Sequence, residues 1–163
     1  MKTLLIVYHS LTGGARQMAQ AALQGAGSEA SVTTRLLTAV ETQPADLLGA
    51  DGYLFVTPEN LAAIAGLMKD FFDRCYYPVL GRIEGRPYAA MVCAGSDGSN
   101  AARQLARIAT GWRLRAVAEP LIVCTHAQTP EEILREKHIG AEDLQRCEAL
   151  GAGLAAGLSL GVY

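Results

Sequence analysis

The stretch VYHSLTGGARQMAQAA, Val7 to Ala22, joins an apolar strand pattern to a helix pattern through Ser10, Thr12 and a glycine pair. The first turn of a helix presents unpaired N–H groups and a partial positive charge. Hydroxyls add donors and glycines let the backbone approach closely, so this joint can hold a phosphate group without a lysine. The pattern matches neither GxxxxGK nor GxGxxG. The alternative is an ordinary capped helix after a glycine turn.

Strand patterns recur along the rest of the chain. Continuous apolar runs are typical of strands that are buried on both faces of a sheet. Such runs occupy Thr3–Tyr8, Tyr53–Thr57, Tyr88–Ala94 and Leu121–Thr125. The run Val32–Leu37 is weaker because threonines and an arginine interrupt it, which suits an edge strand.

Helix patterns separate these runs. Leu61 to Cys75 and Ala102 to Trp112 repeat apolar residues at spacings of three and four, and the last helical region, Pro130 to Leu160, is expected to break near Gly140. Alternating strands and helices imply right-handed crossovers and a parallel sheet. The expected fold class is α/β. We expect a single domain, residues 1–163, with a doubly wound five-stranded parallel sheet in the order 2-1-3-4-5 and helices on both faces.

Composition narrows the class of protein and its partners. Half of the 163 residues are hydrophobic, which is enough to build a core. A net charge of -2 and a pI near 5.9 provide no basic surface, so no nucleic acid partner is expected. The four cysteines lack paired spacing and read as reduced core residues. No segment has the pattern of an export signal or of a membrane span, so we expect a cytoplasmic protein without a membrane partner.

Two further loops carry candidate binding residues, since ligands of such sheets lie beyond the carboxyl ends of the central strands. In TPENLAAIAGLMKDFFDR, Thr57 to Arg74, Pro58 and Asn60 are expected to end the strand, with Asn60 capping the next helix. In CAGSDGSNAARQL, Cys93 to Leu105, small polar residues can pass close to the edge of a flat ring. Each loop also has a simpler interpretation as a turn followed by a helix cap.

Several other chemistries are not favoured by the sequence. Ser96 lies in AGSDG, which lacks the first glycine of the GxSxG nucleophile elbow. His9 and Ser10 stand where a receiver domain needs acidic residues for Mg²⁺. The three histidines show no ligand spacing, so no metal site is expected. For His9 a structural role is favoured, and His126 is a site candidate only if its loop bends toward the binding loops.

The motifs YHSLTGGARQMA, TPENLAAIAGLMKDFFDR and VCAGSDGS resemble those of the flavodoxin-like FMN proteins, nearest to the NAD(P)H-dependent FMN reductases and quinone reductases. The likeness runs through nearly the whole chain. In that family the first loop binds the FMN phosphate, the second runs against the isoalloxazine ring and the third meets its far edge. No catalytic residue is assigned. The resemblance implies the following cofactor-binding residues: Ser10, Leu11, Thr12, Gly13, Gly14, Ala15, Thr57, Pro58, Glu59, Asn60, Ala94, Gly95, Ser96 and Gly98.

Two departures from the family pattern bear on function. Asn60 stands where the family's T-P-E-Y-N string has tyrosine, and neither ring loop contains an aromatic residue. Electron-carrying flavodoxins, by contrast, sandwich the ring between aromatic side chains and have very acidic surfaces. An uncovered flavin face admits a nicotinamide or a quinone, so the resemblance implies an oxidoreductase that passes electrons from NAD(P)H through FMN to a small-molecule acceptor such as a quinone or a flavin.

Two alternatives to this function stay open: an electron carrier, and a binding or regulatory module without a cofactor. Members of the family often bring two subunits together around the flavin, so a homodimer is a further expectation from the resemblance. Tyr76 and Tyr77 are candidates for lining the cleft of that dimer. Ordinary core or surface packing of these tyrosines is the alternative.

Overall fold

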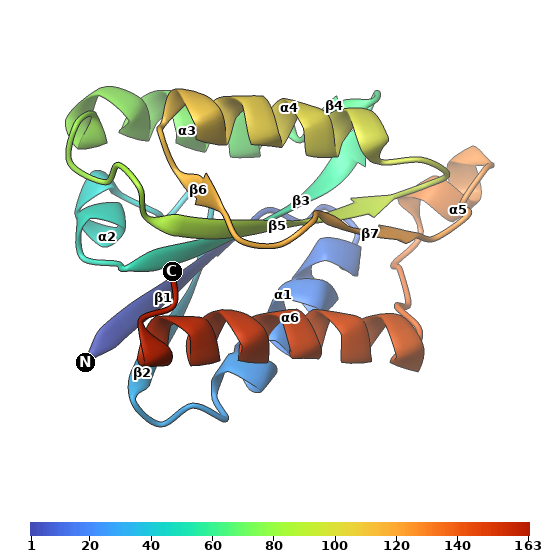
Figure 1. Ribbon diagram of the computed structural model, residues 1–163. Helices are drawn as coiled ribbons and strands as arrows, with labels where there is room; N and C mark the ends of the chain where they lie inside the picture. Colours follow the sequence, from blue (N-terminus) through green and yellow to red (C-terminus); the bar gives the residue numbers. More distant parts are fainter.

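The computed structural model describes all residues, 1–163, and its central layer is a parallel sheet (Figure 1). Neighbouring strands follow the order β2-β1-β3-β5-β6, and β7 also pairs with β5. Since β6 and β7 pair with successive parts of β5, they act as one interrupted strand, and the predicted order 2-1-3-4-5 is confirmed. The parallel strands are β1 Lys2–Tyr8, β2 Val32–Thr38, β3 Gly52–Asn60, β5 Pro87–Ala94, β6 Arg115–Ala116 and β7 Leu121–Cys124.

Helices cover both faces of the sheet, with α2, α3 and α4 on one face and α1 and α6 on the other (Figure 1). Residues within a strand alternate between two cores: Leu5 of β1 packs toward α3 and α4, whereas Leu4 and Ile6 pack toward α1 and α6. Burial on both sides explains the continuous apolar runs. The helices are α1 Gly14–Ala26, α2 Pro44–Leu48, α3 Gly66–Val79, α4 Ser99–Gly111, α5 Pro130–Leu134 and α6 Ala141–Leu160.

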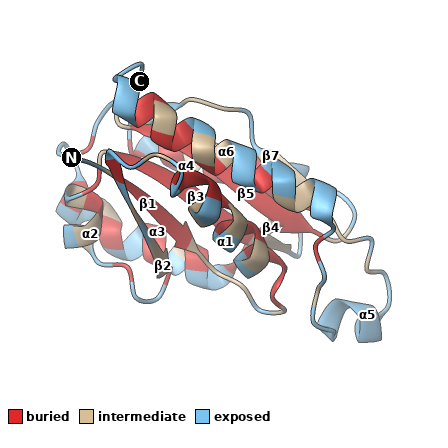
Figure 2. Cartoon of the chain, turned by 90° about the horizontal axis from the view of Figure 1, so that it is seen from below, coloured by how far each residue is buried: buried red, intermediate tan, exposed pale blue.

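The last helical region breaks between α5 and α6, as expected near Gly140. The two parts differ in packing: α5 is exposed along its whole length, whereas α6 buries one side against α1 and the sheet (Figure 2). No helix of the structure has both the length and the hydropathy to cross a bilayer.

The segment after β3 corrects the sequence-based prediction of a helix that Asn60 caps. Strand β3 continues to Asn60, which pairs with Ala63 of the short antiparallel strand β4 (Ala63–Ile64), and α3 begins only at Gly66. Leu61 and Ala62 form the two-residue turn with φ of 50° and 61°. Such a turn normally favours asparagine and glycine, and neither is present at Leu61 or Ala62, so no local signal indicated the hairpin. The spacing of Leu61 and Ile64 is also that of a helix, which is why the sequence predicted one.

Candidate functional site

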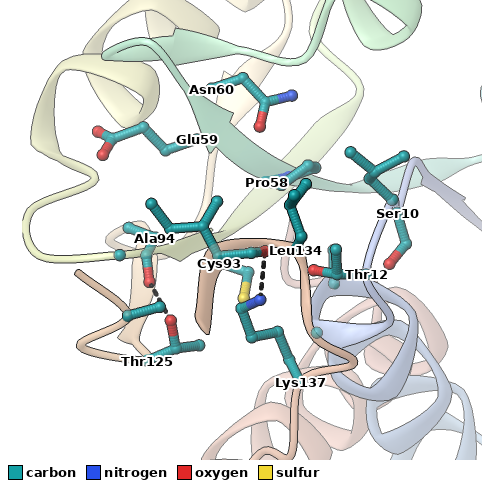
Figure 3. A pocket seen from close by; sticks show the side chains of 16 residues that line it. Ser10, Thr12, Pro58, Glu59, Asn60, Cys93, Ala94, Thr125, Leu134 and Lys137 are labelled. Carbon is teal, nitrogen blue, oxygen red and sulfur yellow. Dashed lines mark hydrogen bonds between the residues drawn. The ribbon is translucent and has the colours of Figure 1, made fainter. Parts of the chain in front are cut away.

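A cavity of about 120 Å³ lies beyond the carboxyl ends of β1, β3 and β5 (Figure 3). The central strands of an open parallel sheet end where its connections diverge, which leaves a crevice between the loops. Five segments of the chain meet there. The lining residues are Ser10, Leu11, Thr12, Gly14, Ala15, Pro58, Glu59, Asn60, Cys93, Ala94, Gly95, Thr125, Ala127, Ile133, Leu134 and Lys137.

The loop after β1 presents hydrogen-bond donors to this cavity. Gly13 has the left-handed φ of 91° and no side chain caps the first turn of α1. The hydroxyl of Ser10 accepts the N–H of Gly13 at 3.0 Å, which closes the loop. The following N–H groups of Gly14 and Ala15 have no carbonyl one turn earlier in a helix to bond. The structure therefore brings unpaired amides and two hydroxyl-bearing side chains to one wall.

Close packing under this loop depends on Gly14. A Cβ at that position would approach the sulfur of Cys93 on β5 to 2.5 Å. Burial raises the pKa of the Cys93 thiol to about 11, although the Lys137 ammonium partly opposes the shift. The thiol stays protonated at neutral pH and serves as packing rather than as a nucleophile.

The loop after β3 contributes Pro58, Glu59 and Asn60 to the cavity wall. Thr57 is not in the wall. It is fully buried, and its hydroxyl donates to the carbonyl of Pro58 at 3.0 Å and accepts the N–H of Ala65 at 3.1 Å. Thr57 thus fastens the hairpin to the start of α3, a role that sequence reasoning missed because the partner lies across a turn.

In the loop after β5, too, some of the predicted residues line the cavity and others do not. Ala94 and Gly95 line the cavity, whereas Ser96 is exposed and Gly98 is buried beside Ile122 at the start of α4. Gly98 adopts a φ of 80°, which explains the glycine without a ligand. Of the predicted binding residues, Gly13, Thr57, Ser96 and Gly98 therefore lie outside the cavity wall.

The fourth and fifth segments of the wall come from the region after β7, where sequence reasoning named only His126. The imidazole of His126 does not line the cavity, and its backbone N–H donates to Gly95 at 2.7 Å. Thr125, Ala127, Ile133, Leu134 and Lys137 line it instead. The string T-P-E-E starting at Thr129, which forms a capping box, was the available signal for α5, but nothing local placed that helix at the cavity.

The remaining candidate residues from the sequence lie outside the cavity wall. Burial lowers the pKa of the half-buried His9, whose backbone N–H bonds Val56, and this side chain does not line the cavity. No group of three His, Cys, Asp or Glu side chains is placed to hold a metal ion. Tyr76 and Tyr77 lie at a ring-centroid distance of 5.0 Å, with Tyr77 largely exposed on α3.

Taken together, the wall fits a phosphate-bearing nucleotide. Unpaired amides and hydroxyls suit a phosphate, Lys137 adds a positive charge, and no aromatic side chain lines the cavity. The profile of the family "NADPH-dependent FMN reductase" matches residues 35–129, which include the second and third loops. This chain belongs to the NADPH-dependent FMN reductase family. The resemblance inferred from the three loops is confirmed, and the family places the chain among the FMN-binding flavoproteins.

Two curated proteins are similar in sequence to part of this chain. A flavodoxin of Aquifex aeolicus (strain VF5) is 32% identical over 98 residues, covering 60% of this chain and 53% of that protein. An NAD(P)H dehydrogenase (quinone) of Acidithiobacillus ferrooxidans is 32% identical over 94 residues, covering 45% of this chain and 47% of that protein. The chain thus spans about half the length of the curated relatives it matches.

Solved structures confirm the flavodoxin-like fold. A flavodoxin from the Archaea superposes with a TM-score of 0.77 at 18% identity, covering 96% of this chain and 99% of that one. A WrbA-like flavodoxin from Agrobacterium tumefaciens superposes with a TM-score of 0.68 at 21% identity, covering 96% of each chain. At these identities the comparison extends to the fold alone.

Proposed function

We propose that this chain binds FMN at the cavity and acts as an NAD(P)H-dependent oxidoreductase toward a quinone, a free flavin or a similar small acceptor. The observation that carries the proposal is the convergence of the uncapped start of α1 with Pro58, Glu59 and Ala94 at one cavity. Bound FMN would accept a hydride from the nicotinamide and pass on one or two electrons. The family profile and the similarity to a quinone dehydrogenase both support a reductase.

The residues of the chain supply binding and orientation in this proposal. Ser10, Thr12 and the amides of Gly14 and Ala15 would hold the phosphate, since they are the donors of the wall. A volume of about 120 Å³ encloses only a small group, so contacts with the ring fall to residues at the rim. Leu11 at that rim is 73% exposed, which leaves the mouth accessible to a second substrate.

A dedicated electron carrier is the second candidate function, because a flavodoxin is equally similar in sequence. The structure offers this candidate less support. No aromatic side chain lines the cavity, and the net charge is only -2. Oxidation of NADH or NADPH by the FMN-loaded protein in the presence of a quinone distinguishes the two functions. An electron carrier by itself oxidises neither NADH nor NADPH.

Titration with FMN, followed by quenching of flavin fluorescence, tests the site. Thr12→Glu places a carboxylate in the wall and is expected to weaken FMN binding by roughly 3 kcal/mol, about a hundredfold, through repulsion of the phosphate. Thr110→Glu is the matched control, because Thr110 is exposed on α4 and does not line the cavity. Unchanged FMN affinity in the Thr12 variant would contradict the placement, and no binding by the unmodified chain would favour a module without a cofactor.

A further inference from the structure

Several hydrogen bonds join the linker between α5 and α6 to the loop after β1, residues 9–13, which is called the phosphate loop below. The backbone N–H of Lys137 donates to the carbonyl of Thr12 at 2.8 Å. The side-chain amide of Gln17 donates to the carbonyls of Lys137 at 2.7 Å and Gly13 at 3.1 Å. The amide oxygen of Gln17 accepts the N–H of Ile139 at 3.1 Å. Gln17 therefore holds the backbone that follows Lys137, while the carbonyl of Thr12 holds the N–H of Lys137 itself.

The ammonium group of Lys137 is held in place without being neutralised. Its Nζ donates to the carbonyl oxygens of Glu132 at 2.9 Å, Ile133 at 2.6 Å and Arg135 at 2.7 Å. These acceptors are dipoles rather than charges, and none of the seven ion pairs of the structure includes Lys137. The ammonium group is therefore fixed in position and has no carboxylate paired with it.

This charge belongs to the cavity. Lys137 is the only lysine or arginine of the wall, and its side chain extends toward Cys93 and Leu134 beside the phosphate loop (Figure 3). Arg16 of α1 is the cation that follows the loop after β1 in the sequence, but it is paired with Glu136 at 3.5 Å. Glu59 is the only carboxylate of the wall and comes from the loop after β3.

We propose that Lys137 is the cation of the phosphate site and that Gln17 is the residue that positions it there. This inference rests on the proposed binding of FMN. The phosphate loop itself lacks a lysine, and the fold supplies one from a segment more than a hundred residues later. A charge that is fixed in advance strengthens phosphate binding, since little conformational entropy is lost when the ligand arrives.

Comparison of FMN with riboflavin, which has the same ring but no phosphate, tests the role of Lys137. Lys137→Gln removes the positive charge and keeps a polar side chain with two N–H donors, whereas the ammonium has three. We expect this variant to bind FMN about tenfold more weakly and riboflavin within about twofold of the unmodified chain. Arg135→Gln is the control, because Arg135 is an exposed cation of the same linker outside the wall, and it should bind both flavins nearly unchanged.

Other outcomes overturn the proposal. Equal losses for FMN and riboflavin would assign Lys137 a purely structural role, and equal effects of the two linker variants would indicate general surface electrostatics. If the unmodified chain binds FMN and Lys137→Gln does not alter that affinity, this inference fails while the proposed function stands. If the unmodified chain binds neither flavin, both fail.

The positioning role of Gln17 has its own readout. Gln17→Leu should show the same selective loss of FMN over riboflavin, because the linker is no longer held at the loop. The double variant Gln17→Leu, Lys137→Gln should bind FMN no more weakly than Lys137→Gln alone. Additive losses in the double variant would show that Gln17 acts independently of Lys137, and thermal unfolding verifies that each variant is folded.

Discussion

Gly14 joins the candidate site to the core at the scale of a single residue. It is the first residue of α1, it lines the cavity, and a Cβ at this position would lie 2.5 Å from the sulfur of Cys93 on β5. The absence of a side chain here serves packing, and under the proposed function it would also let a phosphate approach the backbone. A glycine chosen for packing alone would give the same sequence, which is why the motif by itself left a structural interpretation open.

Gly14→Ala is expected to lower the free energy of unfolding by about 1–3 kcal/mol, because the new methyl group overlaps Cys93. Urea denaturation measures the change. Cys93→Ala provides the partner variant, since it removes the sulfur that the methyl group would meet. The double variant should lose less stability than the sum of the two single variants. Strict additivity would mean that the methyl group meets no resistance from Cys93.

At the scale of elements, the packing of α6 against α1 depends on glycines whose positions are not interchangeable. A Cβ at Gly151 would overlap the backbone of Ala22, and a Cβ at Gly25 would overlap the backbone of Glu148. Gly153, two residues along α6, has open space around it. The glycine-rich tail therefore contains close-contact positions and positions where glycine only weakens the helix.

The paired variants Gly151→Ala and Gly153→Ala should change stability in opposite directions. We expect the first to destabilise the protein by about 2–4 kcal/mol, because backbone cannot move aside as a side chain can. The second should stabilise it by about 0.5–1 kcal/mol through helix propensity. The shift in thermal midpoint distinguishes the two, and equal effects would contradict the observed crossing of the helices.

On the scale of the whole molecule, one sheet separates two cores. Cys75 belongs to the core under α3 and α4, and Cys147 to the core under α1 and α6. Both side chains are fully buried. Burial raises the pKa of both thiols, that of Cys147 to about 12, so neither reacts as a thiolate in the folded protein.

Iodoacetamide labelling across a urea series should modify Cys75 and Cys147 at the same midpoint, because strands common to both cores unfold together in a single domain. Mass spectrometry of the labelled peptides reports each thiol separately. Cys124, which is only partly buried, provides the comparison and should react at lower urea concentrations. Separate midpoints for the two buried thiols would contradict the prediction of one cooperative domain over residues 1–163.

Much of the architecture was accessible from the sequence, because local patterns encode which residues must be buried. Apolar runs marked the strands, the joint after Tyr8 marked the start of α1, and alternation of elements led to the strand order. The loops after three strands were correctly expected to converge, since parallel strands end at one edge of a sheet. The assignment of their residues to FMN stays a prediction.

What the sequence determined by itself was the alternation of elements and hence the crevice, whereas the composition of its wall was decided by tertiary structure. Thr57 faces inward, a hairpin of Leu61 and Ala62 replaces a helical turn, and Gln17 holds Lys137 beside the loop after β1. These features depend on contacts between residues that are distant in the chain or across a turn. Local propensity carries no information about such contacts, because their free energy arises only when the folded backbone brings the partners together.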